Sequence, residues 1–222
     1  LKLLSGEIDS TTGEVVITDN DRMSVLKQDH NAFDEYNVLE TVIMGNQKLY
    51  KIMKEKDAIY SKPDFTDEDG LRVGELEAEF AEMDGWQAES DATELLDGLG
   101  LDSIYYNDLM KNLSGEDKVK VLLAQALFGN PDILILDEVL GVGDIKFKKK
   151  SNEKIQSMMK EGVTVLLVSH SIGQIKKICD KCIWIENGKV REIGEVNYIC
   201  HKYEPEAKNA SKEKTKKLKP QR

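Results

Sequence analysis

Residues 133–138 read Ile-Leu-Ile-Leu-Asp-Glu, a run of large apolar residues followed at once by two carboxylates. A run without polar alternation is typical of a strand that is buried on both faces, as in parallel sheets covered by helices. A second run, Thr164–Val168, is apolar after its first residue and leads into Ser169 and His170. Because open parallel sheets bind ligands at the carboxyl ends of their strands, we expect Asp137 and His170 at one functional edge.

Segments with a helical pattern alternate with these two strands. Another strand is expected further on, and the Asn-Gly pair at residues 187–188 favours a hairpin between it and a last strand. Strands that alternate with helices indicate an α/β fold with a parallel sheet covered on both faces. The elements expected here are helices at Ser114–Phe128, Ile145–Lys160 and Ile172–Ile178, and strands at Cys182–Glu186 and Lys189–Ile193.

The front of the chain has a different organisation. Residues 1–4 carry the apolar spacing of a helix end, and a turn cluster separates short β-type runs at Glu14–Thr18 and Met23–Leu26. From about residue 37 to residue 112 the pattern is helical and strongly acidic, with a loop expected at residues 61–70. We therefore expect a helical subdomain, at about residues 37–112, inserted into the α/β core.

The composition narrows the classes of function. The 222 residues carry a net charge of −10 with a pI of about 5.0, which argues against a general nucleic-acid-binding protein. No apolar run approaches the ~20 residues that span a bilayer. The three cysteines are too few and too clustered for a disulfide framework, so we expect a cytoplasmic protein. Residues 204–222 are rich in lysine, which predicts a basic, disordered tail.

Four features that suit phosphoryl transfer follow one another along the chain. They are Gln28 after a strand, Leu-Ser-Gly-Glu-Asp at residues 113–117, the Asp137–Glu138 pair, and His170. Asp137 can hold Mg²⁺, and Glu138 can orient or deprotonate an attacking water. His170 can donate a hydrogen bond toward a γ-phosphate, and Gln28 offers a side-chain oxygen to metal or water.

Each feature taken alone also has an ordinary structural explanation. Ser114 and Gly115 open a helix whose free N–H groups attract an anion, but Ser114 with Asp117 is equally a helix-capping pattern. Apolar residues followed by Asp-Glu are common where a strand runs into a helix cap, and a single histidine after a strand is usually structural. The order and spacing of all four features together favour the functional interpretation.

In this order the features resemble the Q-loop, the signature motif, the Walker B strand with its catalytic glutamate, and the H-loop of ATP-binding-cassette (ABC) ATPases. The resemblance has two parts. Residues 1–138 resemble the first cassette of the ABC-F group of ribosome-associated ATPases, notably at residues 25–30 and 119–128. Residues 139–203 resemble the ATPase subunits of teichoic-acid and O-antigen exporters, with Asp144 in the place of the D-loop aspartate.

The resemblance implies a P-loop NTPase-like ABC nucleotide-binding domain over residues 1–203 that uses ATP with Mg²⁺. Two such cassettes enclose two ATP molecules, so the implied partner is a second cassette, together with the ribosome for an ABC-F protein. For an exporter the further partner is a membrane permease, which would place the chain at the inner face of the membrane. The implied roles are general base for Glu138, γ-phosphate contact for His170, Mg²⁺ and water ligation for Asp137 and Gln28, and contact with the partner's ATP for Ser114, Gly115 and Asp144.

Two departures from the family pattern bear on activity. Glu116 and Asp117 stand where the signature motif has its second glycine and its Gln or Glu, and a carboxylate beside a phosphate is electrostatically unfavourable. The phosphate-loop pattern G-x-x-x-x-G-K-[S/T] does not occur in the 222 residues, so the resemblance implies an N-terminally truncated cassette with weak ATP binding.

Whether the chain is an active ATPase is left open at this point. The first hypothesis is an ABC-F-type translation factor, on the strength of residues 1–138. The second is the ATPase subunit of a polysaccharide exporter, on the strength of residues 139–203. The third is an inactive fragment or hybrid gene product.

Overall fold

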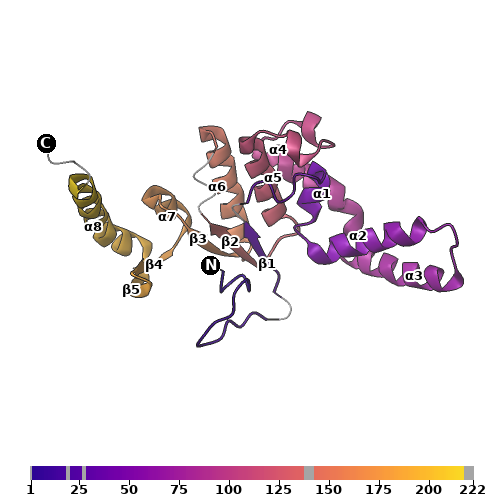
Figure 1. Ribbon diagram of the computed structural model, residues 1–222, viewed down its shortest axis with the longest axis horizontal. Coiled ribbons are helices and arrows are strands. Elements are labelled where there is room, and N and C mark those ends of the chain that lie inside the picture. The colour runs from indigo at the N-terminus through magenta and orange to yellow at the C-terminus, as the bar shows by residue number, and fades with distance from the viewer. Residues whose placement is uncertain (1, 19–20, 27–28, 138–142, 218–222) are drawn as a thin grey trace. The chain divides into compact units, whose positions relative to one another are not determined.

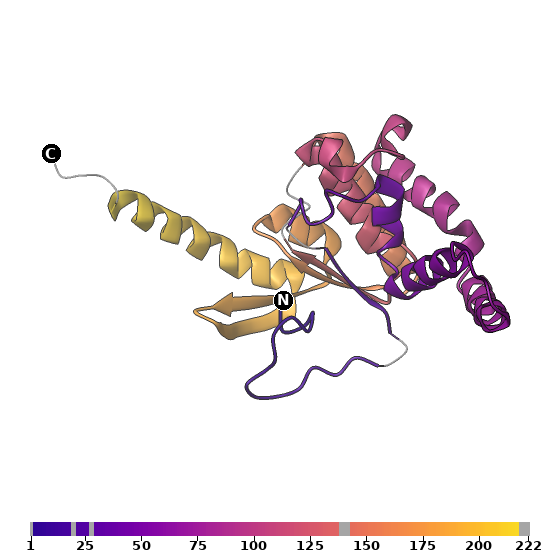
Figure 2. The same ribbon diagram turned by 45° about the vertical axis from the view of Figure 1, so that its right-hand side comes forward.

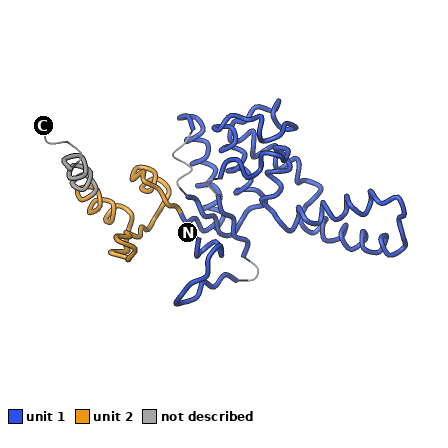
Figure 3. The backbone as a smooth tube through the Cα atoms, viewed as in Figure 1, with its two compact units in different colours: residues 1–166 blue, residues 167–222 orange. Residues whose placement is uncertain are grey.

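The computed structural model of the protein describes residues 2–18, 21–26, 29–137 and 143–217, with side chains up to residue 206. Contacts divide the chain into two compact units, Leu1–Leu166 and Leu167–Arg222 (Figure 3). The sequence predicts a single domain over residues 1–203. The boundary between the two units lies between Leu166 and Leu167, inside the strand Thr164–Val168. Each unit has buried apolar side chains of its own.

Unit 1 combines a small sheet with a larger set of helices (Figure 1). Its regular elements are β1 (Met23–Leu26), α1 (Val38–Ile43), α2 (Gln47–Tyr60), α3 (Asp67–Glu82), α4 (Ala88–Leu99), α5 (Gly115–Leu127), β2 (Ile133–Asp137), α6 (Ile145–Lys160) and β3 (Thr164–Val168), whose last two residues belong to unit 2. Short 3-10 helices lie at Gly85–Gln87, Ser103–Tyr105 and Met110–Asn112. The helical region predicted at about residues 37–112 thus contains α1 to α4.

The sheet is built on the strand that the apolar run predicts. β1 pairs with β2 in parallel, from Met23 opposite Ile133 to Leu26 opposite Leu136, and β3 follows β2 in the strand order. Leu26 and Leu136 are at most 1% exposed, and α5 packs against β1. The parallel pairing and the helical cover confirm the predicted α/β fold class.

Arg22 anchors the start of β1 to the ends of two helices. Its guanidinium donates to the carbonyl oxygens of Gly45 at 3.1 Å and Phe128 at 2.8 Å, and its backbone N–H donates to the carboxylate of Asp132 at 2.8 Å. Burial lowers the pKa of Arg22, although the carboxylate of Asp132 opposes that change. A single side chain therefore joins the sheet to the helical region.

The first residues of the chain differ from the prediction. Residues 2–6 form turns rather than a helix end, and Glu14–Thr18 is not a strand. The side chain of Val16 is 76% exposed, so this apolar run packs against no core. β-type residues need a neighbouring strand and a covered face to form a strand, and the described structure offers neither here.

The helices α2 and α3 lie side by side and project from the rest of unit 1 (Figure 1). Lys56 joins them from inside the pair, where it is 7% exposed. Its ammonium lies 2.9 Å from the carboxylate of Glu77 and 3.8 Å from the centroid of the Phe80 ring, with Trp86 at 4.8 Å. An ion pair and two aromatic faces compensate this buried charge, so it stabilises the helix pair.

A capping box begins α3. The Thr66 hydroxyl accepts from the N–H of Asp69 at 3.2 Å, and the Asp69 carboxylate accepts from the N–H of Thr66 at 3.1 Å. The ammonium of Lys62 and the two donors of Thr66 lower the pKa of Asp69 to about 2. The carboxylate is therefore the form that stabilises the start of the helix.

We expect this stabilisation to disappear in acid. Because the pKa of folded Asp69 lies below its ordinary value of 3.8, the contribution is present above that pH and is lost as the pH falls toward 2. Hydrogen exchange of the first turn of α3 should be slower in the natural protein than in Asp69→Asn at pH 5. That difference should vanish near pH 2. A difference that stays constant over this pH range would contradict the assignment.

Unit 2 is a β-hairpin packed against a long helix (Figure 2). It contains α7 (Ile172–Ile178), β4 (Lys181–Glu186), β5 (Lys189–Glu195) and α8 (Val196–Lys217). β4 and β5 are antiparallel, and both Asn187 and Gly188 have positive φ, at 50° and 74°, which confirms the predicted turn. Buried Trp184 meets Tyr203 of α8 edge to face, with ring centroids 5.3 Å apart.

The predicted tail is helical over most of its length, since α8 runs on to Lys217. Arg191 of β5 donates to both carboxylate oxygens of Glu206, at 2.6 and 2.9 Å, and Lys176 donates to Glu204 at 2.5 Å. These ion pairs attach Glu204 and Glu206 to the rest of unit 2, although the composition alone predicts that both belong to a disordered tail. Among the residues that the structure describes, no helix has the length and apolar content needed to cross a bilayer.

Candidate functional site

The turn that opens α5 contains two of the predicted site residues. Ser114 is the N-cap: its hydroxyl accepts from the N–H of Asp117 at 3.2 Å and donates to the Asp117 carboxylate at 2.7 Å. This geometry confirms the capping interpretation of Ser114. At Gly115, a Cβ would meet no atom within 4 Å, so open space lies beside this turn.

The Asp117 carboxylate is held in its charged form. Partial burial by itself would raise its pKa, but the ammonium of Lys120, at 2.7 Å, and the hydroxyl of Ser114 together lower it. The negative charge next to the turn at Ser114 and Gly115 is thus partly neutralised within α5. This arrangement weakens the electrostatic objection raised by Asp117 in the sequence.

Glu116, the other departure from the signature pattern, connects the turn to the predicted D-loop residue. Its carboxylate accepts from the backbone N–H of Asp144 at 3.1 Å. Asp144 in turn caps α6, because its carboxylate accepts from the N–H of Phe147 at 2.6 Å. The structure therefore brings Ser114, Gly115 and Asp144 together within unit 1, through a side chain that is glycine in the family pattern.

Lys118 is a functional candidate that the sequence analysis missed. It is only 7% exposed, and its ammonium pairs with the carboxylate of Asp34 and donates to the side-chain oxygen of Asn31 at 2.8 Å. Asn31 and Asp34 belong to the segment just after Gln28. A buried lysine therefore ties the segment after Gln28 to α5. The sequence did contain a signal for this contact, because Lys118 is a charged residue on the apolar face of the predicted helix Ser114–Phe128.

Replacing Lys118 with methionine should destabilise unit 1 by about 1–2 kcal/mol and speed hydrogen exchange in residues 31–36, because Asp34 loses its buried partner. Lys111→Met is the matched control. It removes an ion pair with Glu35 whose side chains are 45% and 79% exposed, so its effect should stay below about 0.5 kcal/mol. Equal effects of the two substitutions on exchange would contradict a specific role for Lys118.

Of the other predicted residues, the structure describes Asp137 and His170. Asp137 ends β2 and is half-buried. His170 follows β3 in unit 2 and is exposed. The hydroxyl of Ser169 accepts from the N–H of Ser171 at 3.0 Å, which fixes the backbone around this histidine. Gln28 and Glu138 lie outside the described residues.

The chain is similar to known ATP-binding proteins. The family model described as "ABC transporter" matches residues 1–141. The ABC transporter ATP-binding protein YkpA of Bacillus subtilis is 48% identical over 191 residues, which is 86% of this chain and 35% of YkpA. The teichoic acids export ATP-binding protein TagH of Listeria innocua is 40% identical over 100 residues, which is 45% of this chain and 30% of TagH.

The fold agrees with that of solved cassettes. The dimeric ATP-binding cassette MJ0796, solved in a post-hydrolysis state with ADP and Pi, superposes with a TM-score of 0.63 at 20% identity, over 88% of this chain and 78% of that one. The chain spans about a third of the length of the curated relatives that it matches. On the family match over residues 1–141, the chain belongs to the ABC transporter family.

Proposed function

We propose that this chain supplies the Walker B, signature and H-loop residues of ATP sites that it forms with a second cassette. The observation that carries the proposal is the turn at residues 113–117. Hydrogen bonds tie its helix both to the segment after Gln28, through Lys118, and to Asp144, through Glu116. Three motifs that take part in one ATP cycle in this family are thereby connected within one unit.

The signature turn is suited to an anion from a partner. α5 has N–H groups at its first turn that are not bonded within the helix, and its dipole favours negative charge there. Open space beside Gly115 lets a phosphate approach the backbone. Ser114 keeps the turn in shape through its capping bonds, so we assign Ser114 and Gly115 to the contact with the partner's ATP.

The carboxyl end of β2 is suited to Mg²⁺ and water. The residues fit a metal that arrives with its nucleotide, because Mg²⁺ in such sites uses one or two carboxylates together with phosphate oxygens and water. Asp137 is the described carboxylate for this purpose, and Gln28 would add a second oxygen. When bound, Mg²⁺ supplies charge neutralisation at the phosphates. Glu138 would take the proton of the attacking water, and His170 would donate a hydrogen bond to the γ-phosphate.

For the biological setting, we propose first an ABC-F-type role on the ribosome. It is supported by the likeness of residues 1–138 to that group and by the acidic helical region, which suits contact with a protein surface better than with RNA. The alternative is the ATPase subunit of a teichoic-acid or related polysaccharide exporter, supported by the match to TagH. Nucleotide-dependent cosedimentation with purified ribosomes would favour the first role, and copurification with a membrane permease would favour the second.

The composite site is tested by association with a complete cassette that carries its own phosphate loop. Sedimentation velocity should show a heterodimer that forms only with MgATP. Ser114→Arg should weaken this association by about tenfold or more, because a bulky side chain fills the space beside the turn. Ser103→Arg, which adds the same charge at an exposed position of unit 1, should leave it unchanged. The proposal would be refuted if the heterodimer formed equally well without MgATP, or if both variants weakened its association to the same extent.

A further inference from the structure

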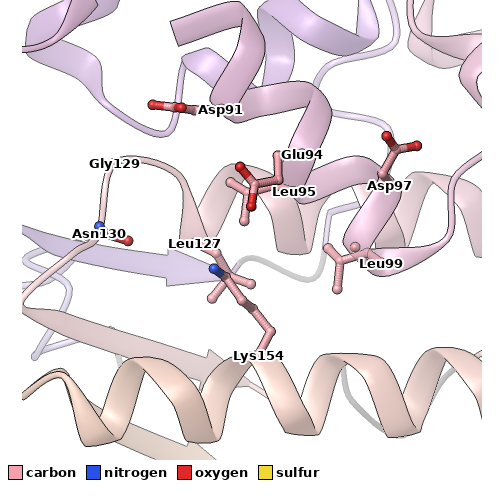
Figure 4. Close-up of a pocket in the computed structure, with 10 residues that line it drawn as sticks. Asp91, Glu94, Leu95, Asp97, Leu99, Leu127, Gly129, Asn130 and Lys154 are labelled. Carbon is pink, nitrogen blue, oxygen red and sulfur yellow. The ribbon is translucent and has the colours of Figure 1, made fainter. Parts of the chain in front are cut away.

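We propose that a groove between α4 and α6 binds an arginine or lysine side chain presented by a basic segment of a partner protein. The groove has a volume of about 690 Å³ and lies within unit 1 (Figure 4). Its walls come from α4, from the end of α5 with the turn that follows it, and from α6. The residues assigned above to ATP do not line it, so the inference is independent of the proposed nucleotide site.

The interior of the groove offers an apolar surface of limited extent. Leu95, Leu99 and Leu127 line it, and the last two are almost completely buried beneath it. A surface of this kind suits the methylene stem of a long basic side chain, which can lie on apolar atoms while its charged end stays near water. It is too small to hold a large apolar anchor by burial alone.

Two carboxylates stand on the α4 wall without a counter-charge. Figure 4 shows Asp91 and Glu94 projecting from the same side of α4, as a spacing of three residues requires. Among the described residues, none forms a hydrogen bond or ion pair with either carboxylate. Asp97, one turn further on, differs: it accepts from the Tyr106 hydroxyl at 2.5 Å and points away in the same view.

The opposite wall of the groove, on α6, carries a positive charge. Lys154 rises from α6 toward Leu127, and it too lacks a charged partner within the part of the chain that the structure describes. An incoming cation is therefore attracted to the α4 wall and repelled from the α6 wall. The guanidinium or ammonium of the partner is expected at Asp91 and Glu94, with its stem on the leucines below.

The charge of the surrounding region selects a basic partner. Residues 37–112 contain 18 acidic and 7 basic residues, so the negative charge of the whole chain is concentrated there. Such a field draws a basic protein segment toward the groove and raises its association rate. It disfavours nucleic acid, whose phosphates carry the same sign.

The test uses a fluorescein-labelled octapeptide in which arginine and leucine alternate, followed by fluorescence anisotropy at low salt without nucleotide. The natural chain should bind it, and a peptide of alternating glutamate and leucine should not bind. Asp91→Asn combined with Glu94→Gln should weaken binding by about 3- to 30-fold, which corresponds to the loss of two exposed ion pairs. Lys154→Met should strengthen binding by about twofold or more, because it removes the repulsion.

The control is Glu68→Gln combined with Glu82→Gln, which changes the net charge equally at exposed positions of α3 outside the groove. It should change the affinity by less than about twofold. Three results would each overturn the proposal: no detectable binding, equal weakening by the two double variants, or weaker binding by Lys154→Met. Thermal unfolding measured on every variant ensures that folded proteins are compared.

Discussion

Gly45→Ala should destabilise unit 1 by about 3 kcal/mol or more, because the added methyl group has nowhere to go. A Cβ at this position would lie 1.9 Å from the backbone oxygen of Gln125 and 2.9 Å from its carbonyl carbon. The obstacle is the backbone of α5, so a side-chain rotation cannot relieve it. The two helices would have to move apart, and the bond from Arg22 to the Gly45 carbonyl would weaken with them.

Urea unfolding followed by tryptophan fluorescence measures this effect. Trp184→Phe leaves Trp86 as the reporter, and Trp86 lies in unit 1. Gly74→Ala is the matched control, because a Cβ in the middle of α3 would meet no atom within 4 Å. It should stabilise the protein by about 0.5–1 kcal/mol through helix propensity. If the two substitutions had similar effects, the close approach of α1 and α5 would be refuted.

By themselves, the 222 residues are expected to bind MgATP with a Kd above about 1 mM. The phosphate-loop pattern contributes backbone N–H groups, a lysine and a hydroxyl to the phosphates and Mg²⁺, and this sequence contains no copy of the pattern. Charge-assisted hydrogen bonds contribute about 1.5–3 kcal/mol each. The loss of two or three of them weakens affinity by about 10³- to 10⁶-fold.

Isothermal titration calorimetry measures this Kd for MgATP. The Glu138→Gln variant is used because the substitution suppresses ATP turnover during the titration. A complete cassette with its own phosphate loop, titrated in the same buffer, shows what full binding looks like. Micromolar binding by this chain alone would contradict the estimate and would require another group to replace the phosphate loop. The heterodimer experiment would still test the proposed contact with the partner's ATP, because its outcome depends on the turn at Ser114 and not on ATP binding by this chain alone.

Several elements could be predicted from the sequence to the residue, for reasons that are local. The helices at Ile145–Lys160 and Ile172–Ile178 and the strand at Thr164–Val168 have the predicted bounds. Local patterns of apolar residues mark these boundaries, and Asp144 caps the first of the two helices. The predicted strand at Glu14–Thr18 lacked such support and did not form.

The hydrogen bonds that connect the candidate site residues could not be predicted from the sequence. The sequence identified Ser114 and Asp144 from their motifs, yet it treated Glu116 only as an unfavourable charge. The structure pairs Glu116 with a backbone N–H 28 positions away, and Lys118 with Asp34 at a separation of 84. Contacts at these distances depend on how α5 packs, which no local pattern encodes.

The sequence by itself determined the fold class and the boundaries of several elements, because periodicity, capping and turn chemistry act between near neighbours in the chain. Only the tertiary structure decided that the chain forms two units, that α8 continues to Lys217, and that Gly45 must lack a side chain. It alone also placed Asp91 and Glu94 opposite Lys154 on the walls of a groove. These features follow from long-range packing, where the position of one backbone fixes the space and the partners left to another.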